Sequence, residues 1–165
     1  DRLVSYLTRM TGCRESAEDV AQDTFLRFHA AVPRYRDEGH LPAYLFRIAT
    51  NLVRQEERRR KRWRLLLPRL TAASNGRNGH RAAFAAEDRL LAREMSDRLT
   101  AAVAALPLAH RVPIVLRDVE GHSYAEITRI TGWREGTVKS RLNRARSKLR
   151  SQLRPYLDGD RSHDA

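Results

Sequence analysis

Apolar residues recur along most of the chain at the three- and four-residue spacing of an α-helix, and no segment alternates as a strand would. In the first half this spacing predicts a short helix over about 2–11, a second from Ser16 to Pro33, and a long third over about 42–64. Gly12 is expected to end the first helix and Ser16 to cap the second. The positions expected to face a shared core are Leu3, Leu7, Met10, Ala21, Thr24, Phe25, Phe28, Val32, Leu41, Leu45, Ile48, Ala49 and Leu52. We therefore expect an all-α fold whose first three helices pack together.

The second half contains a further set of helical segments, with helical spacing from Leu91 to Leu106 and again over about 108–119. The residues Ser123–Glu126 then have the S-x-x-E form of a capping box, in which each side chain accepts a backbone N–H of the other residue. A short helix from this box, a glycine-containing turn at 131–133 and a longer helix over about 135–153 have the layout of a helix-turn-helix.

A composition change separates the two halves. The stretch after Pro68 is rich in small and polar residues and contains Gly76 and Gly79, which is typical of a linker. We predict two small helical domains at 1–66 and 86–157, a flexible linker at 67–85 and a disordered tail at 158–165.

Charge narrows the class of partner. The chain of 165 residues carries a formal charge of +12, which suits nucleic acid or an acidic membrane surface. Its single cysteine, Cys13, excludes an intramolecular disulfide and favours a reducing cytoplasm. The longest aliphatic run, Leu65–Leu67, is far shorter than the ~20 apolar residues of a membrane-spanning helix.

Basic and amide side chains gather on the last helix. Between residues 134 and 154 there are eight basic residues and one acid, Glu135. Residues of these types hydrogen-bond base edges and phosphates, whereas the alternative is an ordinary solvated basic face. The candidate DNA-binding residues here are Lys139, Ser140, Arg141, Asn143, Arg144 and Arg146.

A second basic surface is predicted on the third helix. Arg47, Asn51, Arg54 and Arg58 follow one another at three- and four-residue spacing, so they form one polar ridge that leads into the basic run Arg58–Arg64. Such a ridge can follow a phosphate backbone, although a basic helix end also interacts with the helix dipole.

The second helix carries an acidic face instead. Glu18, Asp19, Gln22 and Asp23 lie at helical spacing on one side of it. Because acids repel DNA, this face suits a basic protein surface, unless it is only a solvated face.

Catalytic motifs are absent from the sequence. It contains no glycine-rich phosphate loop, no G-x-S-x-G and no H-E-x-x-H, and its six histidines have no metal-ligand spacing. We therefore expect no enzymatic activity, cofactor, metal or small-molecule substrate.

These segments together resemble the extracytoplasmic-function (ECF) class of bacterial RNA polymerase sigma factors, in the second and fourth conserved regions of that family. The matching residues are Ser16–Leu26, Tyr35–Arg36, Tyr44–Asn51, Leu106–Pro107, Val115–Ile127, Gly136–Leu142 and Arg144–Arg146. The resemblance implies a factor that brings core RNA polymerase to promoters and helps to melt them.

The resemblance also implies a role for each surface. The acidic face around Asp19 and Asp23 would dock on the clamp helices of the largest polymerase subunit, with a further contact to the polymerase flap. Tyr35, Arg36 and Asn51, with the arginines of the ridge, would take the single-stranded −10 element, and the helix from 135 would read the −35 duplex. An anti-sigma factor is an implied partner and could hold the protein at the membrane, while the active factor would be nucleoid-associated. The second region would be truncated at its N-terminal end.

Two other classes of protein fit the same residues. A stand-alone helix-turn-helix regulator would bind duplex DNA without polymerase, usually at a palindrome. A helical adaptor could lie on an acidic membrane, but the third helix offers only Trp63 and Leu65–Leu67 as an apolar face.

Overall fold

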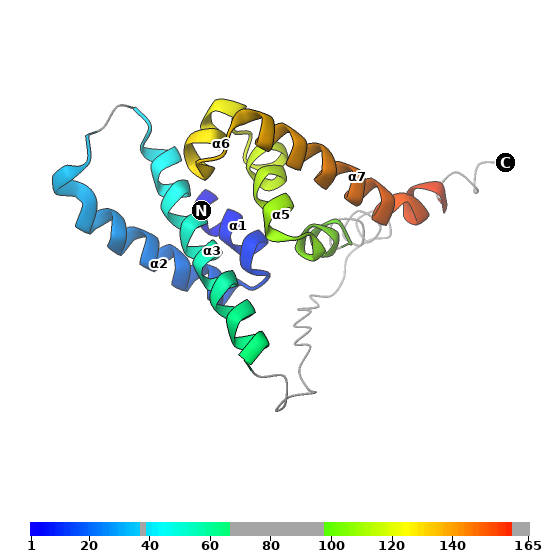
Figure 1. Ribbon diagram of the computed structural model, residues 1–165, viewed down its shortest axis with the longest axis horizontal. Coiled ribbons are helices and arrows are strands. Elements are labelled where there is room, and N and C mark those ends of the chain that lie inside the picture. Colours follow the sequence, from blue (N-terminus) through cyan, green and yellow to red (C-terminus); the bar gives the residue numbers. More distant parts are fainter. Residues whose placement is uncertain (37–38, 67–97, 160–165) are drawn as a thin grey trace, which may run out of the picture.

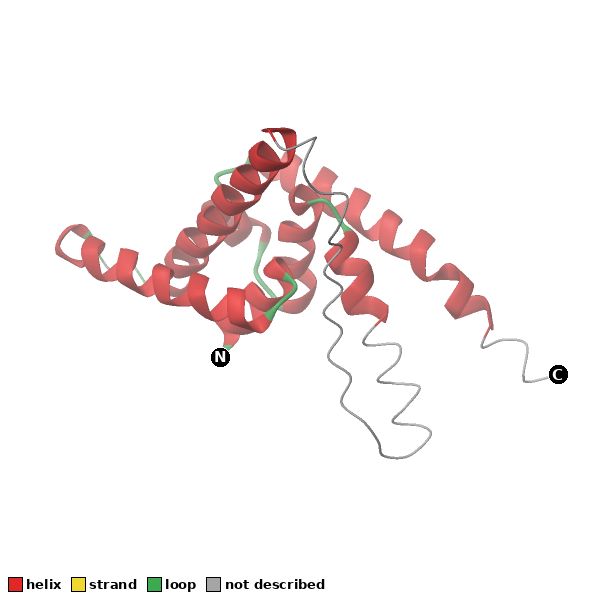
Figure 2. Ribbon diagram, turned by 90° about the horizontal axis from the view of Figure 1, so that it is seen from below, coloured by secondary structure: helices red, strands yellow, loops and turns green. Residues whose placement is uncertain are grey.

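The computed structural model describes residues 1–36, 39–66 and 98–159, and every regular element within these ranges is helical. The predicted linker at 67–85, the beginning of the predicted second domain and residues 160–165 of the predicted tail lie outside them. The elements of the first half are α1 (Arg2–Thr11), α2 (Arg14–Ala31), a 3₁₀ turn (Val32–Arg34) and α3 (Leu41–Leu66). The all-α class predicted from the sequence is confirmed for the described residues (Figures 1 and 2).

The boundary between α1 and α2 corrects one predicted cap. Gly12 ends α1 as predicted, in the left-handed conformation with φ of 80°, and its N–H donates to the oxygen of Thr8 at 2.8 Å. Ser16, however, lies inside the first turn of α2, and Cys13 is the N-cap residue. The Cys13 sulfur accepts the Ser16 N–H at 3.5 Å, because the extended backbone of Cys13 places its side chain over the first helical turn.

The buried face of α2 is rotated from the predicted one. Its buried residues are Ala17, Ala21 and Thr24, whereas Phe25 is 52% exposed and Val32 is 49% exposed. Small side chains face inward because α1 and α3 both pack against this helix. The prediction that Phe25 and Val32 belong to the core is therefore wrong.

The buried residues of α3 also differ in part from the predicted ones. Phe46 and Val53 are buried together with the predicted Ala49 and Leu52. The predicted core residues Leu41, Leu45 and Ile48 are only half-buried. Within this core the hydroxyl groups of Tyr6 and Thr50 form a hydrogen bond of 2.8 Å between α1 and α3. Burial strongly raises the pKa of the Tyr6 hydroxyl.

In the second half, the described residues form a helical segment at 98–105, followed by α5 (Leu108–Ile114), a π-helical turn (Val115–Val119), α6 (Tyr124–Thr131) and α7 (Glu135–Gly159). The helix predicted over 108–119 is thus an α-helix that continues as a π turn, in which the Glu120 N–H reaches back five residues to the Val115 oxygen at 2.9 Å. α7 extends beyond its predicted end near 153 and includes the first two residues of the predicted tail.

The two halves pack against each other. α6 packs against α3 and lies beside the first part of that helix (Figure 1). The rings of Phe46 in α3 and His122, just before α6, meet edge to face with centroids 4.9 Å apart. Arg111 of α5 donates to the Met10 oxygen at the end of α1 at 2.7 Å. The described helices therefore share one continuous hydrophobic core.

Candidate nucleic-acid interface

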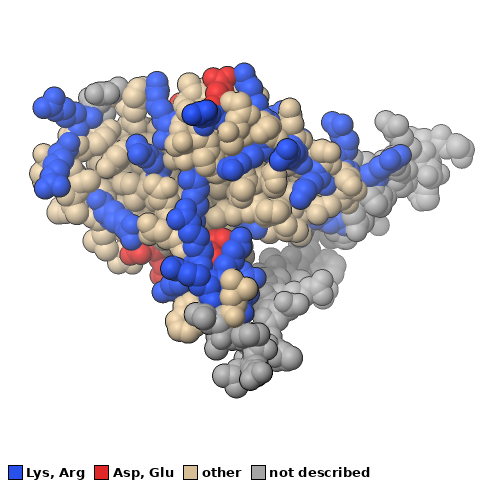
Figure 3. All heavy atoms as spheres, in the orientation of Figure 1, with Lys and Arg blue, Asp and Glu red and all other residues tan. Residues whose placement is uncertain are grey.

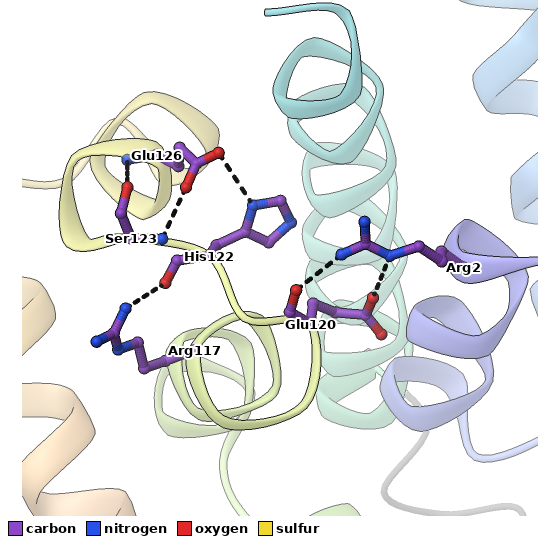
Figure 4. Close-up of polar contacts among 6 residues, drawn as sticks. All are labelled: Arg2, Arg117, Glu120, His122, Ser123 and Glu126. Atoms are coloured by element: carbon purple, nitrogen blue, oxygen red, sulfur yellow. Dashed lines mark hydrogen bonds and ion pairs between the residues drawn. The ribbon is translucent and has the colours of Figure 1, made fainter.

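The capping box that begins α6 has both of its hydrogen bonds (Figure 4). The Ser123 N–H donates to a Glu126 carboxylate oxygen at 2.7 Å, and the Glu126 N–H donates to the Ser123 hydroxyl at 3.2 Å. Hydrogen bonding to Ser123, above all from its backbone N–H, lowers the pKa of the Glu126 carboxyl. Gly121, in the left-handed conformation with φ of 76°, allows the chain to turn into this cap. The predicted start of the helix-turn-helix is thus confirmed.

The turn between α6 and α7 is held by short-range hydrogen bonds. Gly132 takes the left-handed conformation with φ of 69°, and the Trp133 N–H donates to the Thr131 hydroxyl at 3.2 Å. α7 then buries Val138, Leu142 and further apolar residues at helical spacing. Because that face is buried, the remaining side of α7 is presented to solvent.

Two of the predicted DNA-binding side chains on α7 are tied to acids of the same chain. Lys139 is 2.6 Å from a Glu135 oxygen, and this contact raises the pKa of Lys139. Arg146 forms a two-point ion pair with Asp118 of the π turn, at 2.6 and 3.0 Å, which raises the pKa of Arg146. Arg146 therefore connects α7 to the element that precedes the helix-turn-helix.

The other predicted residues of α7 differ in their surroundings. The Ser140 hydroxyl donates to the Thr137 oxygen at 3.1 Å. Arg141 is half-buried, with its guanidinium carbon 3.9 Å from the centre of the Trp133 ring. Asn143 and Arg144 are exposed, and their side chains have no ion-pair or hydrogen-bond partner within the described part of the chain. Of the six predicted residues of α7, these two are thus the most open to a ligand.

A second candidate surface lies at the junction between α2 and α3. The rings of Tyr35 and Tyr44 have centroids 4.9 Å apart, and Phe28 lies edge-on to Tyr35 at 5.6 Å. Beside them is a pocket of about 210 Å³ that also contains Arg36 and Arg47. It is smaller than the roughly 300–1,000 Å³ typical of small-molecule sites. Aromatic rings with flanking cations are suited to stacking a single base.

The polar ridge predicted on α3 is only partly open. Arg47, Asn51 and Arg58 are exposed, as expected for a DNA-binding ridge. Arg54 is half-buried: it donates to the Thr131 oxygen of α6 at 3.0 Å, and its guanidinium carbon is 4.5 Å from the Trp133 ring centre. Burial lowers the pKa of Arg54, and the nearby charges of Arg141 and Arg58 lower it further.

The basic run that follows the ridge is partly neutralised. Glu56 pairs with Arg59 at 3.0 Å and Arg60 at 3.1 Å, and Glu57 pairs with Lys61 at 3.4 Å. Among the charged side chains, basic ones nevertheless predominate on the face of the molecule shown in Figure 3.

The acidic face of α2 is exposed and continues into apolar side chains, with Glu18 paired to Arg14 at 2.7 Å. Asp19 and Asp23 are both exposed, as are Glu18 and Gln22. Leu26, 61% exposed, is one helical turn from Gln22 and Asp23, and Phe25, 52% exposed, lies on the flank of the same face. The sequence interpretation missed these two residues, although exposed apolar groups beside acids are typical of a protein-binding surface.

Comparison with known proteins assigns the two halves. Residues 1–64 match the family model of sigma-70 region 2, and residues 96–149 match that of sigma-70 region 4. The chain is 31% identical to the ECF RNA polymerase sigma factor EcfG of Rhodopseudomonas palustris strain TIE-1, over 95% of this chain and 81% of EcfG. It is 32% identical to the ECF RNA polymerase sigma factor SigW of Bacillus subtilis strain 168, over 93% of this chain and 84% of SigW. The chain belongs to the ECF RNA polymerase sigma factors.

A solved structure agrees with this assignment. The sigma factor RpoE of Bartonella quintana, crystallised with the anti-sigma factor NepR, superposes with a TM-score of 0.72 at 27% identity, over 93% of this chain and 90% of RpoE. The ECF resemblance expected from the sequence is therefore confirmed. This sigma factor is a non-enzymatic initiation factor that directs RNA polymerase to promoters.

The matches place each candidate surface in a region of this sigma factor. The acidic face of α2 and the ridge on α3 lie within the region 2 match, and the helix-turn-helix lies within the region 4 match. The aromatic pocket is lined mainly by region 2 residues, but Arg129 of α6 also lines it. Trp133, which the sequence interpretation treated only as a turn residue, contacts arginines from both regions. A tryptophan directly before an arginine-rich helix was the available signal.

The described ranges contain neither a metal-binding cluster nor a membrane-spanning helix. No three His, Cys, Asp or Glu side chains lie close enough to hold a metal ion among the residues that the structure describes. None of the helices in the same ranges is long and apolar enough to cross a membrane.

Proposed function

We propose that this sigma factor reads the −35 element as duplex through α7 and the −10 element as single-stranded DNA through the aromatic pocket and the α3 ridge. The observation that carries the proposal is the exposed row of Asn143 and Arg144 on a helix whose opposite face is buried in a helix-turn-helix. A helix fixed in this way can place amide and guanidinium groups against base edges and phosphates in the major groove.

The −10 half of the proposal rests on the pocket beside Tyr35 and Tyr44. Removing a base from the DNA stack costs a few kcal/mol of free energy, and stacking that base on aromatic rings of the protein regains about 1–3 kcal/mol. Arg36 and Arg47 at the pocket would hold the adjoining phosphates. Because duplex DNA offers no unstacked base, this pocket would favour melted DNA and so assist promoter opening.

The polymerase contact in this proposal is the acidic face of α2. Asp19 and Asp23 would meet the clamp helices of the largest subunit, and the exposed Leu26 would add apolar contact. A contact of the second half with the polymerase flap would hold both DNA-reading surfaces at a fixed spacing. Two weak DNA contacts held in this way act at high effective concentration.

We further propose that an anti-sigma factor binds this chain. The support is the likeness to RpoE, which was crystallised with the anti-sigma factor NepR. A protein of this kind would compete with polymerase for the same sigma factor.

In vitro transcription tests the proposed function. Core polymerase with this chain should yield promoter-directed transcripts from templates with matched −35 and −10 elements, and core polymerase alone should not. A stand-alone regulator would instead bind a palindromic duplex tightly without polymerase and yield no transcript. That outcome would overturn the proposal.

A second readout isolates the −10 role. Asn51→Ala should reduce permanganate reactivity of the melted promoter region while binding to a −35 duplex is unchanged, because Asn51 is exposed on α3 and is not part of α7. Equal permanganate patterns in the variant and the parent would exclude Asn51 from base capture.

A further inference from the structure

A cavity of about 460 Å³ lies at the end of α1, between α3 and the beginning of α5 (Figure 1). This volume is within the roughly 300–1,000 Å³ typical of small-molecule sites. The apolar part of the wall comes from all three helices of the first half and from the beginning of α5, and it is formed by Met10, Val20, Val53, Leu106 and Leu108. None of the residues proposed to bind DNA lines the cavity, so it is separate from both DNA-reading surfaces.

Arg111 of α5 brings a positive charge to the wall of this cavity. Its guanidinium group donates to the backbone oxygens of Met10 at 2.7 Å, of Leu106 at 2.9 Å and of Ala104. These acceptors are neutral carbonyl groups, and the Nε atom is buried without a hydrogen-bond partner among the described residues. Burial lowers the pKa of Arg111, because a charge that is partly withdrawn from water is costly. The carbonyl groups therefore fix the position of this cation but do not neutralise it.

The acids that line the cavity are engaged by other cations. Glu56 forms an ion pair with Arg60 at 3.1 Å, and Glu57 forms one with Lys61 at 3.4 Å. The charge of Glu57 also acts on Arg111, but burial has the larger effect on the pKa of Arg111. A ligand that complements this cavity therefore combines an apolar body with a negative charge.

We propose that this cavity binds an aliphatic carboxylate, with the alkyl chain against Met10, Val53 and Leu106 and the carboxylate beside Arg111. A carboxylate accepts strong, charge-assisted hydrogen bonds from a guanidinium group, and burial of the alkyl chain removes apolar surface from water. A cationic head group would be repelled by Arg111, and a neutral one would leave its charge unpaired. Because the lining residues belong to both the region 2 match and the region 4 match, the bound carboxylate would contact both regions at once.

Calorimetric titration of the full chain with decanoate, below the concentration at which it forms micelles, tests the proposal. Decan-1-ol and decyltrimethylammonium carry the same alkyl chain with a neutral and a positive head group. Decanoate should bind saturably at one site, and decan-1-ol should bind about tenfold more weakly, because a hydrogen bond between two charged groups is the stronger one. Decyltrimethylammonium should show no measurable binding.

A pair of matched variants locates the ligand. Val20→Phe enlarges a side chain at the cavity wall and should weaken decanoate binding by at least about tenfold, because the ring takes space that the alkyl chain needs. Val4 is likewise a half-buried valine packed against the core, but it does not line this cavity. Val4→Phe should therefore leave the affinity for decanoate unchanged.

A second pair tests the head-group contact. Arg111→Met should remove the preference for decanoate over decan-1-ol, because the cation is lost and the apolar wall is kept. Arg60→Ala should retain that preference, since Arg60 lines the same cavity but is paired with Glu56. Circular dichroism verifies folding, because Arg111 also bonds three backbone oxygens. If Arg111→Met does not fold, the head-group series and Val20→Phe decide the matter.

Three results would overturn the proposal. Equal affinity of the parent for decanoate and decan-1-ol would show an apolar cavity without an anion site. Equal decanoate binding by Val20→Phe and Val4→Phe would place the ligand elsewhere. Absence of saturable decanoate binding would exclude this class of ligand and leave the cavity as a packing gap or as a surface that another protein covers. These titrations involve neither DNA nor polymerase, so promoter-directed transcription by the same chain would leave the proposed function intact.

Discussion

Arg146 and Asp118 form a two-point ion pair, at 2.6 and 3.0 Å, between α7 and the π turn that precedes the helix-turn-helix. Both side chains are partly exposed, so the pair stabilises modestly, but its geometry fixes how α7 lies on its own domain. A residue that the sequence assigns to DNA binding is thus engaged in positioning the recognition helix.

The first prediction concerns this pair. Arg146→Ala should lower the free energy of unfolding by about 0.5–1 kcal/mol and weaken binding to all −35 sequences evenly, because α7 loses its tie to the domain. A double-mutant cycle with Asp118→Ala, followed by thermal denaturation, measures the coupling. Arg150→Ala is the control, since Arg150 is exposed one turn later and has no ion pair among the described residues. A coupling energy near zero would leave Arg146 as a DNA contact only.

The second prediction distinguishes the two remaining arginines of α7. Arg141 is held against Trp133, so its fork is pre-oriented for a guanine edge, whereas Arg144 is exposed and unconstrained and suits a phosphate. Arg141→Ala should relax specificity at one −35 position by about 1–3 kcal/mol. Arg144→Ala should weaken all sequences alike and reduce the salt slope by about 0.9. Titration of both variants with a panel of −35 duplexes at several salt concentrations measures these effects. Relaxed specificity in Arg144→Ala and an even loss of affinity in Arg141→Ala would show that the two roles are reversed.

The third prediction concerns the capping box of α6. Ser123→Ala should lower the free energy of unfolding by about 0.5–2 kcal/mol, because the Glu126 N–H loses its acceptor. The hydrogen bonds of Ser123 lower the pKa of Glu126 in the folded state, so their contribution is present above the ordinary Glu pKa near 4.3 and is lost as the pH falls through the lowered value. Ser123→Ala keeps the Ser123 N–H that donates to this carboxylate, so its effect on stability should change little with pH. Thermal melts across the acidic range should instead converge at low pH for the parent and Glu126→Gln, and a constant difference between those two at every pH would exclude the linkage.

The fourth prediction tests the docking face of α2. Asp19→Lys with Asp23→Lys should weaken binding to core polymerase by more than about tenfold, because like charges at an interface cost several kcal/mol. Leu26→Ser should weaken it less. Leu99→Ser is the matched control, since Leu99 is also an exposed leucine, at 44%, on a different helix. Pull-down with core polymerase, with circular dichroism to verify folding, measures the effect; equal binding by all variants would remove the docking role.

Much of the helical layout was predictable because it depends on residues near one another in the chain. Three local features illustrate this: the left-handed glycines Gly12 and Gly132 and the capping box at Ser123. Each acts within about one helical turn, so each can be predicted from neighbouring residues in the sequence. The basic face of α7 was predictable for the same reason, since the apolar residues at helical spacing leave only one side of the helix exposed to solvent.

The orientation of α2 and the surroundings of the arginines were decided only by tertiary packing. Phe25 fits an inward-facing stripe in sequence, but the close approach of α1 and α3 leaves room there only for Ala17, Ala21 and Thr24. Arg54 and Arg58 have equivalent places on the predicted ridge, and only the position of α6 beside α3 gives Arg54 a backbone oxygen and an indole ring to contact. The sequence by itself determined where most of the helices and several of their caps lie, because those follow from bonds within a few residues. Contacts between residues from opposite halves of the chain determined which arginine is half-buried and which is exposed. A local sequence pattern does not show which distant residues will come into contact.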